Sequence, residues 1–109
     1  MEIIIKGTVD LTPPLRTYIQ KKLAPLVKFI PQFDGTGEAE IRLEVSRTTH
    51  HHRKGPVFFA AADLRLPHKI LRAEGYAEDI RKAIDQVRDT LRLEIEKYKT
   101  RITEPRRGR

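Results

Sequence analysis

The spacing of apolar residues changes along this chain, and the change restricts the folds that it can adopt. In residues 38–47, EAEIRLEVSR, apolar and polar residues alternate strictly, as in a strand with one buried face. From Ala77 to about Ile102, apolar residues instead recur every three or four positions, which predicts a long amphipathic helix. The chain therefore combines strands with a helix that must bury one stripe against them.

An N-terminal strand and a first helix precede the alternating segment. Residues 2–7, EIIIKG, form a short β-branched run and predict a strand. Thr12 is a good helix N-cap, and Pro13 suits the first helical position because its missing N–H has no partner there anyway. Apolar residues then follow at helical spacing as far as Ile30. Pro25 is expected to kink this helix or to start a second short one.

Two more strands are predicted at 57–67 and 68–75, with a tight turn near Pro67. The order is β-α-β-β-β-α, so we predict an α+β fold with one four-stranded sheet and both helices on one face. The first strand should run parallel to the second, because a helix carries the chain between them. One domain is expected over 1–102, followed by a disordered basic tail at 103–109.

Several classes of protein are not supported by the composition. The 109 residues contain no cysteine, which removes disulfides, thiolate zinc sites and cysteine nucleophiles. There is no nucleotide-binding fingerprint, and Ser46 is the only serine, so we expect no enzyme, cofactor or small-molecule substrate. The N-terminus resembles neither a signal peptide nor a membrane span. We expect a cytoplasmic protein without a membrane partner.

Positive charge is concentrated in two segments. The net charge is +7, of which residues 97–109 contribute +5 and residues 47–54 contribute +3, so the remainder sums to −1. A polyanionic partner is the simplest reason for this distribution. The alternative is a solubilising surface with a frayed basic tail.

A histidine tract lies in the loop predicted between the second and third strands. His50 and His52 could share a metal ion, but the loop offers no cysteine and no acid to complete a site. We therefore expect adventitious metal binding at most. Together with Arg47, Arg53 and Lys54, the tract is better interpreted as an RNA-facing hairpin tip.

Four cations of the last helix, Arg81, Arg88, Arg92 and Lys99, project within roughly 40° of one another beside the apolar stripe. We expect an unpaired positive rail there, which Asp85 and Glu96 offset only in part. A solvated flank is the alternative. On the open face of the sheet, Phe59 is the only aromatic residue expected, which favours recognition of RNA backbone and shape over base stacking.

Residues 71–101, LRAEGYAEDIRKAIDQVRDTLRLEIEKYKTR, resemble the ribosome hibernation promoting factor family, also called ribosome-associated inhibitors or sigma-54 modulation proteins. The similar elements are AEG at 73–75, an acid at Asp79, AID at 83–85, Leu91 and KYKTR at 97–101. The beginning of the chain is similar as well. The chain departs from the family pattern by an apparent insertion of Tyr76 and Ala77, by Arg81-Lys82 in place of a tyrosine before AID, and by Thr90 and Leu93 at two usually basic positions.

The resemblance implies a stress or stationary-phase factor that lies on the small ribosomal subunit, where transfer RNA and messenger RNA pass, and inhibits translation by occupancy. It also implies a short form without the C-terminal dimerisation domain of longer members. The alternatives are a double-stranded-RNA-binding-like module or a non-enzymatic interaction or metal-binding protein. The candidate contacts to ribosomal RNA are Lys21, Lys22, Lys28, Arg47, His50, His52, Arg53, Lys54, Arg81, Lys82, Arg88, Arg92, Lys97, Lys99 and Arg101.

Overall fold

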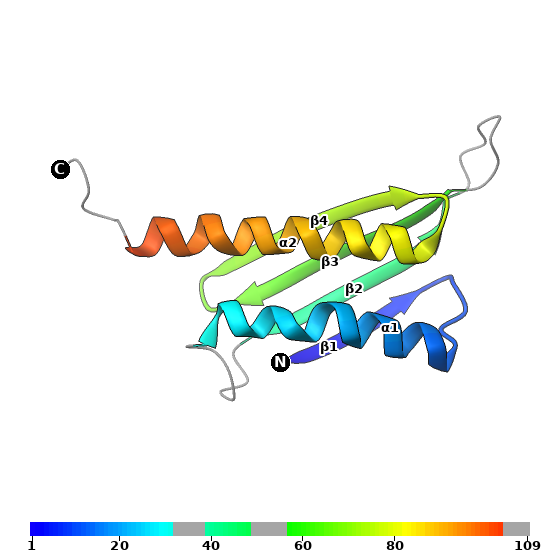
Figure 1. Cartoon of the computed structure of the whole chain (residues 1–109), viewed down its shortest axis with the longest axis horizontal. Helices are drawn as coiled ribbons and strands as arrows, with labels where there is room; N and C mark the ends of the chain where they lie inside the picture. The colour runs from blue at the N-terminus through cyan, green and yellow to red at the C-terminus, as the bar shows by residue number, and fades with distance from the viewer. Residues whose placement is uncertain (32–38, 49–56, 104–109) are drawn as a thin grey trace.

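The computed structural model describes residues 1–31, 39–48 and 57–103. Its elements follow the predicted order β-α-β-β-β-α and form an α+β fold (Figure 1). A short 3-10 helix, η1, continues the first helix. The elements are β1 (Glu2–Gly7), α1 (Pro13–Leu23), η1 (Ala24–Phe29), β2 (Glu40–Arg47), β3 (Phe58–Leu66), β4 (Lys69–Ala77) and α2 (Ile80–Thr103).

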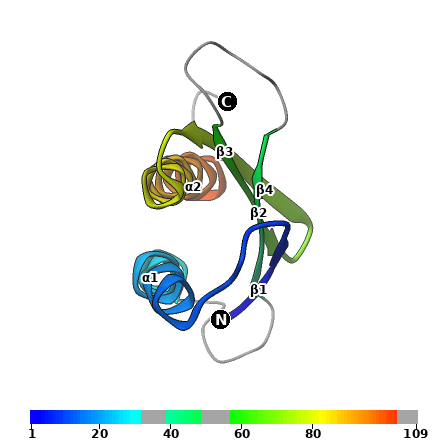
Figure 2. The same ribbon diagram turned by 90° about the vertical axis from the view of Figure 1, so that its right-hand side faces the viewer.

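The four strands form one sheet in the order β1-β2-β3-β4. β1 runs parallel to β2, with Ile3 opposite Ile41, and the other two pairs are antiparallel. The parallel pair was predicted from the helical connection between its strands. Figure 2 shows α1 and α2 side by side on one face of the sheet, while the opposite face carries no helix. The predicted layering is therefore confirmed.

The start of α1 and its change into η1 follow from local sequence. The Thr12 side chain accepts a hydrogen bond from the backbone N–H of Leu15 at 3.3 Å, and prolines occupy the first turn, where no N–H is needed. The α-helix ends at Leu23, and Pro25 lies in the first turn of η1. The predicted second short helix at Pro25 is confirmed, since proline cannot donate the hydrogen bond that would continue an α-helix.

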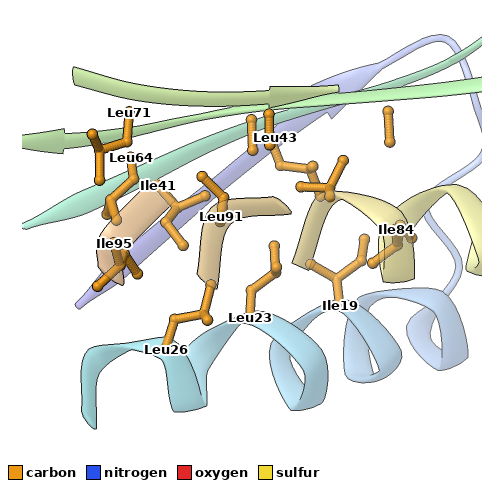
Figure 3. Packing of buried hydrophobic residues seen from close by; sticks show 14 of the residues in the cluster. Ile19, Leu23, Leu26, Ile41, Leu43, Leu64, Leu71, Ile84, Leu91 and Ile95 are labelled. Atoms are coloured by element: carbon orange, nitrogen blue, oxygen red, sulfur yellow. The ribbon is translucent and has the colours of Figure 1, made fainter. Parts of the chain in front are cut away.

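The core fills the space between the sheet and the two helices (Figure 3). The alternating residues of β2 point into it, and Ile41, Leu43 and Val45 are at most 1% exposed. The apolar stripe of α2 packs against the same face of the sheet, over β4 and β3. Its fully buried members are Ile84, Val87, Leu91 and Ile95, while Ile80 and Tyr98 are partly buried.

The boundary between β4 and α2 differs from the prediction. β4 extends beyond Gly75 to Ala77, which pairs with Phe58, and α2 begins at Ile80 instead of Ala77. Asp79 caps the helix, because its carboxylate accepts a hydrogen bond from the N–H of Arg81 at 2.9 Å. Tyr76 and Ala77 are therefore the last residues of a longer strand.

Gly75 allows α2 to approach β4 closely. A Cβ atom at this position would lie 2.6 Å from the carbonyl oxygen of Ala83, so any larger residue would force the helix and strand apart. Gly75 is the glycine of the AEG segment. The close approach of α2 to β4 explains why this position requires a residue without a side chain. The turn before β4 is equally tight, since His68 adopts a positive φ of 68° between β3 and β4.

Candidate nucleic-acid interface

A groove between the two helices gathers cations from three elements. Lys21 and Lys22 come from the last turn of α1, Lys28 from η1, and Arg88 and Arg92 from α2. Among the residues that the structure describes, Asp89 is the only acid that lines this groove. The residues are distant in sequence and meet because α1 and α2 lie side by side (Figure 2). The structure thus brings five of the candidate contacts onto one surface, which we call the helix groove.

Tyr18 and Asp85 join the two helices next to the helix groove. The Tyr18 hydroxyl donates a hydrogen bond to Asp85 Oδ1 at 2.7 Å, and Lys22 Nζ lies 3.6 Å from the same oxygen. The guanidinium of Arg81 stands 4.9 Å from the centre of the Tyr18 ring. Desolvation, together with the hydrogen bond to the Asp85 carboxylate and its charge, raises the pKa of Tyr18.

The rail on α2 is not unpaired, so that part of the prediction was wrong. Arg88 Nε lies 2.7 Å from Asp89 Oδ1, and Arg92 Nε lies 3.9 Å from Glu96 Oε2. The second pair has the i, i+4 spacing at which helical side chains meet. Both pairs include exposed acids, and such pairs contribute little to stability. An RNA phosphate can therefore compete for these guanidinium groups.

Two arginines lie against aromatic rings, one in the helix groove and one outside it. Arg92 stacks on Phe29 of η1 at 4.9 Å, and Arg47 stacks on Phe58 at 5.1 Å. Arg47 and Arg81 also line a second hollow at the end of the sheet, next to Phe58. Because Arg81 contacts Tyr18 as well, it connects this second hollow with the helix groove.

The remaining candidate contacts are placed less specifically. Lys82, Lys97 and Arg101 are exposed on α2, Lys99 is half-buried there, and none of them lines either hollow. Lys97 approaches Glu94 at 3.4 Å. His50, His52, Arg53 and Lys54 lie outside the described residues, as does the tail from residue 104. The RNA-facing hairpin tip and the basic tail therefore remain predictions, although α2 extends one residue into the expected tail.

One aromatic residue of the open sheet face was missed. Tyr76 is 56% exposed and its ring centre lies 4.8 Å from that of Phe59 on the neighbouring strand. The prediction ended the strand at Gly75 and so overlooked it. Tyr76 continues the alternation of Arg72 and Glu74, and this signal was available in the sequence.

Within the ranges that the structure describes, no group of three or more histidine, aspartate or glutamate residues could hold a metal ion. In the same ranges, no helix is both long and apolar enough to cross a membrane.

Residues 3–103 match the family model described as sigma 54 modulation protein / S30EA ribosomal protein. The chain belongs to this family. Two curated relatives, both named ribosome hibernation promotion factor, support the assignment. The protein of Deinococcus radiodurans is 32% identical over 98 residues, covering 90% of this chain and 48% of the relative. That of Lactococcus lactis subsp. cremoris is 32% identical over 101 residues, covering 90% and 49%.

Two solved structures share the fold. The N-terminal domain of Thermus thermophilus Protein Y superimposes with a TM-score of 0.65 at 25% identity, covering 90% of this chain and 99% of that domain. A ribosomal subunit interface protein from Coxiella burnetii gives a TM-score of 0.69 at 24% identity, covering 92% and 99%. The resemblance to the hibernation family is therefore confirmed. The chain spans about half the length of the curated relatives that it matches.

Proposed function

We propose that this protein binds the small ribosomal subunit where transfer RNA and messenger RNA pass, and inhibits translation there under stress or in stationary phase. The observation that carries the proposal is the helix groove, in which, within the described ranges of the chain, five cations converge and Asp89 is the only acid. Family membership makes the ribosome the natural partner, and ribosomal RNA offers the polyanionic surface that such a groove fits.

The groove is suited to contacts with the RNA backbone. Arginine can donate two parallel hydrogen bonds to one phosphate, and lysine contributes a mobile point charge. Tyr18 and Phe29 have cations stacked on their rings, so these rings support the cations instead of presenting a free stacking surface. Recognition of backbone and shape follows from this arrangement. Inhibition then requires no chemistry, because the bound protein occupies space that the other RNAs need.

A salt series tests this mode of binding. The affinity of the purified protein for small ribosomal subunits would be measured by sedimentation at several salt concentrations. If about five phosphates are contacted, the affinity should fall by several hundred-fold between roughly 50 and 200 mM salt, because cations on the protein displace condensed counterions. Affinity that changes little over this range would contradict an RNA-backbone interface.

Competition separates the proposal from the nearest alternative, a double-stranded-RNA-binding-like module. Transfer RNA should displace the protein from small subunits, and the protein should lower translation in an extract. A free RNA duplex that binds as tightly as small subunits do, without competition by transfer RNA on the subunit, would favour the alternative.

A further inference from the structure

We propose that Tyr18 and Asp85 are positioning residues that hold Lys22 and Arg81 in place for RNA phosphates. On this view, the Asp85 carboxylate strengthens the binding of RNA although it carries the same sign of charge as the ligand. The inference rests on the proposed function, because the phosphates are those of the ribosomal RNA. It adds two residues that are not themselves contacts to RNA.

These four residues form a compact cluster across the helix pair. Tyr18 and Lys22 are separated by four positions on α1, and Arg81 and Asp85 by four positions on α2, so each pair occupies one face of its helix. One oxygen, Asp85 Oδ1, joins the two helices: it accepts the hydrogen bond from the Tyr18 hydroxyl and lies 3.6 Å from Lys22 Nζ.

Both cations of the cluster are also held by the Tyr18 ring. Arg81 stands 4.9 Å and Lys22 Nζ 5.4 Å from the ring centre, distances at which the face of the ring attracts a cation. Long basic side chains lose rotamer freedom when they bind a ligand. Here part of that ordering has already occurred in the free protein, which lowers the entropic cost of binding a phosphate.

The location of Asp85 is otherwise difficult to explain. A carboxylate beside a cationic groove should repel phosphate. Its side chain is 37% exposed and that of Lys22 is 28% exposed, so the pair is partly withdrawn from water. The phenol donor and the ammonium group offset the charge of the carboxylate. The Asp85 carboxylate therefore acts as a fixed acceptor that orients the cations of both helices.

Two isosteric substitutions distinguish positioning from simple charge repulsion. Asp85→Asn removes the negative charge but keeps an acceptor for Tyr18, and Asp63→Asn makes the same change on the open face of the sheet, where the acid pairs with Arg72. If Asp85 positions Lys22, its substitution should weaken binding to small subunits by about threefold to fivefold. Asp63→Asn should leave binding unchanged, because this acid lies on the open face of the sheet and does not line the helix groove.

Tyr18→Phe provides a test without any change of charge. It removes the hydroxyl and keeps the ring, and binding should weaken by about threefold. Nitrogen-15 relaxation of the Arg81 side chain in this variant should show greater mobility, a change that a role in stability alone would not produce. Thermal unfolding of each variant would show that the fold is intact.

The failures of the two proposals are distinguishable. Asp85→Asn that binds as tightly as Asp63→Asn, with Arg81 equally ordered in the parent and in Tyr18→Phe, would overturn the positioning role alone. A parent protein that does not bind small subunits at all would overturn the proposed function, and with it this inference.

Discussion

The open face of the sheet and the helix groove both carry charged residues, but in different proportions. On the open face, Arg72 lies 3.0 Å from both Asp63 and Glu74, and Arg42 pairs with Glu40. The strand register places five acids and four cations on this face: Glu2, Glu40, Glu44, Asp63 and Glu74 with Lys6, Arg42, Arg65 and Arg72. The helix groove instead has five cations and one acid.

The two surfaces differ in their surplus of cations, and we propose that this surplus, and not the mere presence of cations, marks the surface that binds RNA. On the open face Arg42 and Arg72 pair with acids, and the five acids outnumber the four cations, so the positive field there is offset. In the helix groove the cations of two helices face a common space, and their fields add. The contrast can be tested by making the same change of charge in the helix groove and on the open face of the sheet.

The largest expected effect comes from reversing charge in the helix groove. The triple substitution Lys28→Glu, Arg88→Glu and Arg92→Glu should weaken binding to small subunits by roughly 100-fold or more, because like charges across an interface repel strongly. Folding should be affected little, since these are surface charges. Sedimentation with small subunits measures the first effect and urea unfolding the second.

The matched control makes the same change of charge on the open face, with Lys6→Glu, Arg42→Glu and Arg65→Glu. Its binding should remain within a fewfold of the parent. Equal losses in the two triple variants would mean that net charge alone governs binding and that the helix groove has no special role.

A smaller effect is expected on the free energy of unfolding when residues on the covered and open sides of β4 are substituted. Gly75→Ala adds a Cβ that would lie 2.6 Å from the carbonyl oxygen of Ala83, so we expect a loss of about 1–3 kcal/mol in the free energy of unfolding from overpacking. Glu74→Ala, on the open side, should change it by about 0.5 kcal/mol or less. Urea unfolding of both variants tests this, and equal stabilities would show that close packing of α2 on β4 is not required.

The smallest expected effect is on the dependence of stability on alkaline pH. The pKa of Tyr18 is raised above 10.0 in the folded protein, so the folded state keeps a proton that the unfolded state loses. The stabilisation from this group is complete below pH 10 and is lost as the pH rises through the raised pKa. The urea midpoint of Tyr18→Phe should therefore decline less steeply above pH 10 than that of the parent.

Tyr76→Phe, on the open face, serves as the control for this experiment and should follow the parent. A decline in Tyr18→Phe that parallels the parent would show that desolvation and the hydrogen bond to Asp85 do not raise the pKa of Tyr18.

Local pattern was sufficient to predict most of the fold. Thr12 and Pro13 mark the start of α1, Pro25 marks its change into η1, and the alternation in β2 identifies its buried face. These signals depend only on neighbours within a few residues, which the sequence displays directly. The limits of β4 were misjudged because Gly75 was taken as a strand end, whereas its missing side chain serves the packing of α2.

The candidate site was predicted in composition but not in arrangement. The cations of α1, η1 and α2 were identified, yet nothing in their spacing indicates that Lys28 and Arg92 line one groove. The pairing of Arg88 with Asp89 was also missed, because its formation depends on side-chain conformation and not on the angular position of the residues along the helix.

The sequence by itself determined the order of the elements, the faces that they bury and the excess of positive charge, because these follow from periodicity and composition. Only the tertiary structure decided which charges meet. Contacts such as Tyr18 with Asp85, or Phe59 with Tyr76, join elements distant along the chain. They depend on the distance and angle at which helices pack and on the register of the strands, and these are set by the core as a whole.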